Sequence, residues 1–137
     1  MIEVYVDGSC PNNQADGLQP TAYGFIVFKD GEEIYQEGNP GELGTNNTAE
    51  YTALINALEW LVQNCLSAEQ IVIYSDSQLV VNQINGIYAV NSENLFTLWH
   101  HAILLLNDFE PGQVKVVWVP RERNLAHELA ESSFISW

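Results

Sequence analysis

The stretch Ile2-Glu3-Val4-Tyr5-Val6-Asp7 is an apolar, strand-like run that ends in a carboxylate. A second apolar run, Ile71-Val72-Ile73-Tyr74, leads to Asp76, and Glu50 lies between the two runs. A carboxylate that loses water at the mouth of a sheet is unfavourable unless something positive compensates it. Several carboxylates together also repel one another unless they share cations. Divalent ions held by carboxylate oxygens are the usual solution, so this pattern predicts a metal site.

The length of 137 residues suits one ordinary domain with a real core, and we expect a single domain over residues 1–137. The chain opens on a strand-like run, without the basic and apolar segments of a signal peptide. No apolar run reaches membrane-spanning length. Cys10 and Cys65 lie far apart and form no CxxC pair. We therefore expect reduced thiols in a cytoplasmic protein, with a disulfide as the alternative.

The chain is strongly acidic, because 18 Asp and Glu residues against 4 Lys and Arg give a formal net charge of −14. Such a chain repels polyanions. It shows no basic stripe of the kind that lets a protein bind nucleic acid by releasing counterions. The charge also fits a soluble acidic surface, adaptation to salt, or a helper protein. Binding to any nucleic acid is therefore expected to be weak and strongly salt-dependent.

The predicted elements follow the order β-β-β-α-β-α-α-β-α, without repeats or a linker. Asp30-Gly31 between two strand-like runs is a hairpin signal. Apolar residues at helical spacing predict the first helix and place Glu50 on its inward face. The strands are expected at residues 2–6, 22–29, 32–36, 70–74 and 113–119, and the helices at 48–63, 79–84, 95–106 and from Asn124.

Each acidic residue also has a purely structural explanation. Asp7-Gly8 is typical of a turn. Asp76 and Ser77 suit the cap of the helix that follows. Glu50 suits the return half of a capping box begun by Asn47. One shared site explains the three residues together, because parallel neighbouring strands would bring Asp7 and Asp76 to one edge. Glu50, on the first turn of a helix packed at that edge, would point at both.

Four blocks of the sequence resemble the type 1 ribonuclease H family, in particular its short reverse-transcriptase-like branch. They are Val4-Tyr5-Val6-Asp7-Gly8-Ser9-Cys10, Thr45-Asn46-Asn47-Thr48-Ala49-Glu50, Ile73-Tyr74-Ser75-Asp76-Ser77-Gln78 and Val119-Pro120-Arg121-Glu122-Arg123-Asn124. The resemblance covers almost the whole chain, with the blocks in the family's order. It implies an α/β fold with a five-stranded mixed sheet flanked by helices, in which two parallel strands extend an antiparallel three-strand meander.

The resemblance implies a metal-dependent endonuclease that hydrolyses the RNA strand of RNA/DNA hybrids and leaves 3′-hydroxyl and 5′-phosphate ends. Two Mg²⁺ or Mn²⁺ ions roughly 4 Å apart would clamp the scissile phosphate. Asp7 would bridge the ions. Glu50 would hold the ion near the leaving group and orient the 2′-hydroxyl side of the substrate, and Asp76 would hold the ion near the nucleophile. Mg²⁺ suits such a site because it keeps several waters and needs few carboxylates.

The fourth position departs from the family's commoner pattern. The family usually has Asn-x-x-Ala-Asp-x-Leu-Ala, where this chain has Asn124-Leu125-Ala126-His127-Glu128-Leu129-Ala130. The resemblance makes His127 the equivalent residue, as a ligand or a proton shuttle, and imidazole suits manganese better than magnesium. The alternative is that His127 only lies on a helix face and that the fourth ligand is lost or supplied by Glu128. Activity would then be slow or manganese-dependent.

The resemblance also implies contacts to the minor groove of the hybrid, where side-chain amides pair naturally with 2′-hydroxyls. The matching amides are Asn12, Asn13, Asn46, Asn47 and Gln78. Turn and capping chemistry is the alternative for the asparagines. Arg121 and Arg123 flank the expected site and are candidates for phosphate contacts, with surface ion pairs to neighbouring glutamates as the alternative.

Two other classes of function fit part of the sequence. A weakly active or non-catalytic nucleic-acid-binding module would use the same fold with an impaired site. An acidic protein-interaction domain would account for the net charge, but it would not explain why Asp7, Glu50 and Asp76 occur together with Gln78. A nuclease for single-stranded RNA or a DNA end would share the chemistry, which does not itself choose the substrate. We expect an RNA/DNA hybrid as the partner, and the sequence sets no oligomeric state.

Overall fold

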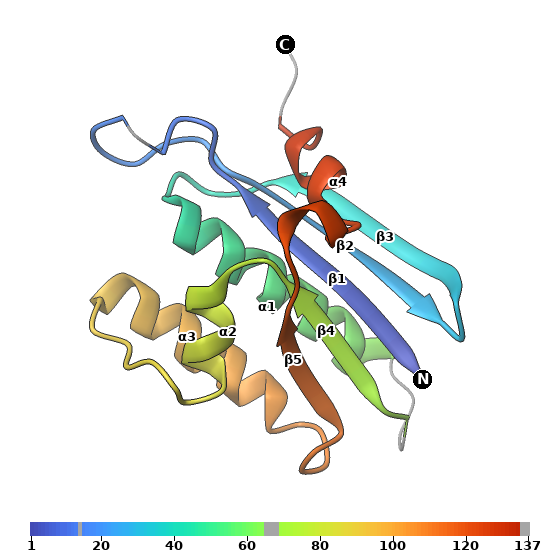
Figure 1. The fold of residues 1–137 in the computed structure, drawn as a ribbon. Helices are drawn as coiled ribbons and strands as arrows, with labels where there is room; N and C mark the ends of the chain where they lie inside the picture. The colour runs from blue at the N-terminus through green and yellow to red at the C-terminus, as the bar shows by residue number, and fades with distance from the viewer. Residues whose placement is uncertain (14, 65–68, 135–137) are drawn as a thin grey trace.

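A mixed five-stranded sheet forms the centre of the molecule, in the order β3-β2-β1-β4-β5 (Figure 1). The strands are β1 (Ile2–Ser9), β2 (Ala22–Lys29), β3 (Glu32–Pro40), β4 (Ile71–Ser75) and β5 (Val114–Trp118). The first three form an antiparallel meander, and β4 and β5 run parallel to β1. The computed structural model describes residues 1–13, 15–64 and 69–134. This topology confirms the predicted α/β sheet.

Helices cover both faces of the sheet. In chain order they are α1 (Asn46–Asn64), α2 (Gln78–Ile84), α3 (Glu93–Leu106) and α4 (His127–Glu131), the last preceded by the 3₁₀ turn η1 (Arg121–Arg123). α1 packs on β1 and β2, α2 packs beside it over β4 and β5, and α3 packs on α1. α4 crosses β1, β2 and β3 on the opposite face (Figure 1). Within the described ranges, no helix has the length and apolar character that crossing a membrane requires.

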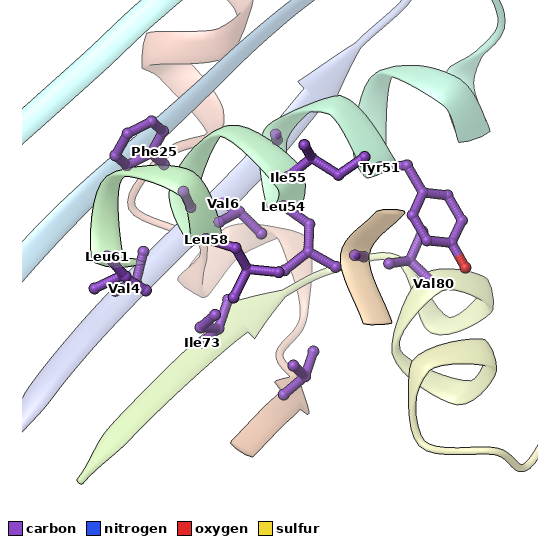
Figure 2. Close-up of a cluster of buried hydrophobic side chains, with 14 of the residues drawn as sticks. Val4, Val6, Phe25, Tyr51, Leu54, Ile55, Leu58, Leu61, Ile73 and Val80 are labelled. Atoms are coloured by element: carbon purple, nitrogen blue, oxygen red, sulfur yellow. The ribbon is translucent and has the colours of Figure 1, made fainter. Parts of the chain in front are cut away.

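The main core lies between α1 and the sheet, as Figure 2 shows. Val4 and Val6 alternate along β1 toward α1, and both are buried. Leu54, Leu58 and Leu61 meet them at helical spacing and are completely buried. Full burial of such a side chain contributes about 1.5 to 3 kcal/mol to stability. This packing fixes the rotation of α1 about its axis. It therefore also fixes the direction of the Glu50 side chain, one turn before Leu54.

Most predicted boundaries lie within two residues of the observed ones, and the three larger differences each have a local cause. β1 does not end before Asp7 but continues to Ser9, because Gly8 and Ser9 still pair with β2. β3 runs to Pro40 rather than to residue 36, because its pairing with β2 continues that far. The last helix begins three residues after Asn124, because η1 and a turn at Asn124 come first.

Candidate active site

The parallel pairing of β1 with β4 brings two acidic residues side by side. Val6 pairs with Ser75, so Asp7, the next residue of β1, lies beside Asp76, the first residue after β4. Asp7 lies on the sheet face that α4 covers, opposite the face that buries Val6 under α1. Asp7 is 3% exposed, whereas Asp76 is half-buried. One side-chain atom each of Asp7, Asp76 and His127 lie within 4.8 Å of one another.

Glu50 reaches the same edge from α1. It is the fifth residue of the helix, which places it just beyond the expected first turn, and its side chain is buried. The backbone N–H of Gly8 donates a hydrogen bond to Glu50 Oε1. Gly8 is required here, because a Cβ at this position would collide with the backbone of Ala49. The close approach of α1 to β1 therefore sets the position of the Glu50 carboxylate.

Threonines, and not Glu50, cap the first helix. The Thr45 N–H donates to Thr48 Oγ1 at 2.9 Å, and the Thr48 N–H donates to Thr45 Oγ1 at 3.3 Å. This reciprocal pair satisfies donors at the start of α1. The capping box that the sequence offered for Asn47 and Glu50 is wrong. Helix capping therefore does not explain why the Glu50 carboxylate is buried.

Asp76 is likewise not used as a helix cap. Ser77 Oγ accepts the N–H of Val80 at 3.2 Å and caps α2 alone. Asp76 instead faces Asn124, whose Nδ2 donates to Asp76 Oδ2 at 3.4 Å and to the Val6 carbonyl at 2.8 Å. The buried Asn124 side chain therefore connects β1, Asp76 and the segment before α4.

His127 completes the cluster from the opposite face of the sheet. It is the first residue of α4, and its Nδ1 lies 3.0 Å from Asp7 Oδ2. Its Nε2 lies 3.2 Å from Glu131 Oε1, one turn along the helix. α4 can sit this close to the strands because Gly24 lacks a side chain that would meet Leu129. Glu128, the alternative fourth ligand, is exposed, and it belongs neither to this three-residue group nor, unlike Glu50, to the pocket lined by Asp7 and His127.

Burial and mutual repulsion dominate the electrostatics of the carboxylates at this site. Burial, and then the charge of Asp76, raise the pKa of Asp7 from 3.8 to about 6, although the hydrogen bond with His127 lowers it. Burial and the charges of Asp7 and Asp76 raise the pKa of Glu50 well above its ordinary value. A divalent cation would reverse both effects, because it stabilises the ionised carboxylates. The set of oxygen donors with one imidazole therefore fits Mg²⁺ or Mn²⁺.

The cluster opens into a pocket of about 280 Å³. Its walls are Asp7, Gly8, Ser9, Cys10, Pro11, Asn46, Glu50, Arg121, His127 and Glu131. Cys10 is a buried free thiol, as expected, and the expectation for Cys65 falls outside the described residues. Arg121 is exposed on η1, so the pocket combines a carboxylate floor with one cationic side chain at its rim.

The predicted substrate contacts divide into three groups. Asn46 and Arg121 line the pocket. Asn13 supports it indirectly, because its Oδ1 accepts the Asn46 N–H at 2.8 Å. Asn12, Asn47, Gln78 and Arg123 lie outside the pocket wall on exposed or half-buried surface. Among the described residues, neither arginine forms the surface ion pair that was the alternative for it.

Sequence reasoning did not single out two residues that the structure places at the site. For Asn124, the signal in the sequence is its position three residues before His127. For Glu131, the signal is its position four residues after His127, the distance at which side chains on one helix meet. Asn124 contacts Asp76, and Glu131 contacts His127, so both lie against residues of the cluster.

Comparisons with known proteins identify the family to which the sequence is similar. The sequence model of the RNase H family matches residues 1–128. Ribonuclease HI of Halobacterium salinarum is 32% identical over 124 residues, which are 90% of this chain and 58% of that protein. Bifunctional protein Rv2228c of Mycobacterium tuberculosis is 31% identical over 125 residues, 90% of this chain and 32% of the relative. The chain thus spans about a third to somewhat over half of these relatives.

The fold also matches solved structures. LC11-RNase H1 in complex with an RNA/DNA hybrid superposes with a TM-score of 0.86 at 28% identity, over 97% of this chain and 96% of that one. The resemblance therefore extends over the whole sheet and its helices.

Proposed function

The chain belongs to the ribonuclease H family, and we propose that it is a metal-dependent endonuclease that cuts the RNA strand of RNA/DNA hybrids. The observation that carries this proposal is that side-chain atoms of Asp7 on β1, Asp76 just after β4 and His127 on α4 lie within 4.8 Å of one another. The hybrid bound by LC11-RNase H1 makes this substrate class the first to test. The expected products carry 3′-hydroxyl and 5′-phosphate ends.

We infer that two divalent ions, Mg²⁺ or Mn²⁺, bind at the cluster. Asp7, Glu50 and Asp76 would hold them through carboxylate oxygens, and His127 would add a nitrogen ligand or move a proton. Bound ions of this kind activate a water and stabilise the leaving oxygen of a phosphodiester. Support comes from the raised pKa values of Asp7 and Glu50, whose cause is buried and mutually repelling charge.

The chain's own residues prepare this site. The Gly8 N–H holds the Glu50 carboxylate, and the amide of Asn124 holds the Asp76 carboxylate. His127 Nδ1 lies 3.0 Å from Asp7 Oδ2, and a hydrogen bond between them requires a proton on one of the two atoms. That proton must leave before the two atoms can bind a cation, since metal ligands have to be deprotonated. Metal binding should therefore release protons.

Substrate contacts would come from the pocket rim. We propose that Arg121 binds a phosphate and that Asn46 meets the hybrid at the pocket, with Asn13 holding Asn46 in place. Further out, Asn12, Asn47, Gln78 and Arg123 are candidates for groove and backbone contacts.

The net charge of −14 sets the conditions for binding. Repulsion between an acidic protein and a polyanion is long-ranged, and salt screens it. We propose that hybrid binding in the cytoplasm depends on raised ionic strength, on divalent ions, or on a cationic helper protein.

The test is cleavage of end-labelled substrates. Purified protein is incubated with an RNA/DNA hybrid, the matching RNA duplex and single-stranded RNA, in Mg²⁺ and then Mn²⁺, at low and high salt. Selective cleavage of the hybrid, with 5′-phosphate on the products, is expected. Cleavage of single-stranded RNA in preference to the hybrid would contradict the proposed substrate. Absence of cleavage under every condition would instead favour a binding role.

A further inference from the structure

Glu131 lines the active-site pocket without having a role in the proposed reaction. Its Oε1 lies 3.2 Å from Nε2 of His127, while Nδ1 of the same ring lies 3.0 Å from Asp7 Oδ2. The imidazole is therefore held between two carboxylates, one at the floor of the pocket and one at its wall. Asp7 is 4% exposed at its side chain and Glu131 is 60% exposed, so the two carboxylates have very different surroundings.

The two ring nitrogens cannot play the same part. A neutral imidazole has one N–H donor and one lone pair, and a nitrogen that carries the proton cannot bind a cation. If Nδ1 kept the proton in its bond with Asp7, the lone pair would point away from the carboxylate cluster. A carboxylate beside Nε2 favours the opposite arrangement, because it accepts the Nε2–H.

We infer that Glu131 is a positioning residue: it accepts the Nε2–H of His127 and leaves Nδ1 free to bind a divalent ion beside Asp7. This inference rests on the proposed metal-dependent function. Histidines that bind metals generally donate the other ring N–H to a carboxylate or carbonyl, which fixes both the ring orientation and the coordinating nitrogen. In this chain the oxygen that meets Nε2 belongs to Glu131.

The helix makes this arrangement reliable. His127 and Glu131 are the first and last residues of α4, four positions apart, where side chains meet on one face. α4 is fixed on the sheet by Leu129, which packs over Gly24 and Gly38. The ring and the carboxylate that orients it are therefore carried by one short, anchored element.

The experiment compares Mn²⁺ binding in four proteins, because Mn²⁺ is paramagnetic and reports its own ligands. The variants are Glu131→Ala, which removes the acceptor, Glu131→Gln, which keeps an acceptor oxygen, and Glu128→Gln as a control. Glu128 is an exposed acid on the same helix, outside the pocket wall. Affinity is measured by electron paramagnetic resonance titration. Electron spin echo modulation then detects a nitrogen bound directly to the ion.

The wild type and Glu128→Gln should show nitrogen coupling. In Glu131→Ala, Mn²⁺ should bind about tenfold more weakly, the lower end of the range for residues that support a metal ligand. The nitrogen coupling should fall as well, and Glu131→Gln should retain most of both properties. A Glu131→Ala protein with unchanged affinity and unchanged coupling would overturn the inference.

The same titration separates this inference from the proposed function. A wild type that binds Mn²⁺ without nitrogen coupling would overturn the role given to Glu131 and leave a carboxylate-only nuclease standing. A wild type that binds no Mn²⁺ would overturn the metal-dependent function itself, and therefore also the role of Glu131 in orienting a metal ligand.

Discussion

Replacing Asp7 by asparagine should make the metal-free protein more stable at neutral pH, although it removes a central ligand. Burial and the Asp76 charge raise the pKa of Asp7 from 3.8 to about 6. The folded protein thus binds this proton more tightly than the unfolded chain does. The stabilisation that protonated Asp7 gives the fold is therefore fully present below about pH 4, and it is lost as the pH rises through about 6.

The size of the effect follows from the pKa shift. Each pKa unit corresponds to about 1.4 kcal/mol, so ionised Asp7 destabilises the metal-free fold by up to about 3 kcal/mol at neutral pH. An amide has the same shape, keeps a hydrogen bond to His127 and has no charge to bury. Asp7→Asn should therefore raise the free energy of unfolding by an amount approaching that limit.

Urea unfolding in the presence of a chelator measures this difference, at about pH 7.5 and at about pH 4. The gain of Asp7→Asn over the wild type should be large at the higher pH and close to zero at the lower. Asp108→Asn, which removes one charge from an exposed position, controls for the change in net charge. Added Mn²⁺ should stabilise the wild type by mass action, and stabilise Asp7→Asn far less. An Asp7→Asn protein that is no more stable at neutral pH, or whose gain does not depend on pH, would show that ionised Asp7 does not destabilise the fold.

Three further predictions concern the site and its support. Mn²⁺ affinity should rise with pH through about 6, because Asp7 must lose its proton before it binds; a calorimetric titration series that is flat over this range would contradict the assignment. Asn124→Ala should lower the free energy of unfolding by about 1 to 3 kcal/mol, because the buried Val6 carbonyl loses its donor, and chemical denaturation would show the drop. Leu58→Ala should lower it by about 2 to 5 kcal/mol, whereas the exposed Leu104→Ala should stay within about 0.5 kcal/mol in the same assay.

The sequence alone predicts the elements that depend on residues close together in the chain. Asp30 and Gly31 both adopt positive φ, at 50° and 85°, which is the backbone of the predicted tight hairpin. β2 accordingly begins and ends where it was expected, at residues 22 and 29. The helical spacing of leucines in α1 likewise reflects real burial, so the sequence pattern and the core coincide.

The remaining features depend on contacts between distant parts of the chain. Asp7-Gly8 looks like a turn locally, but pairing with β2 continues the strand through both residues to Ser9. The start of α4 depends on Asn124, whose side chain bonds to Val6 and lies 118 positions away from it in sequence. Unless the first residue of α4 is known, the contact between His127 and Glu131 cannot be predicted from the sequence. The position of acidic residues at the ends of apolar runs predicts that the carboxylates form a site. It does not predict which groups orient them.

We propose that this cluster cleaves the RNA strand of RNA/DNA hybrids. A time course of an end-labelled RNA/DNA hybrid in Mn²⁺ tests this proposal, with wild type and Asp7→Asn protein at equal concentration and with both shown to be folded. We expect cuts within the RNA strand by the wild type, an uncut DNA strand, and no product above background from Asp7→Asn. Equal cleavage by the two proteins, or a wild type that leaves the hybrid intact while binding Mn²⁺, would contradict it.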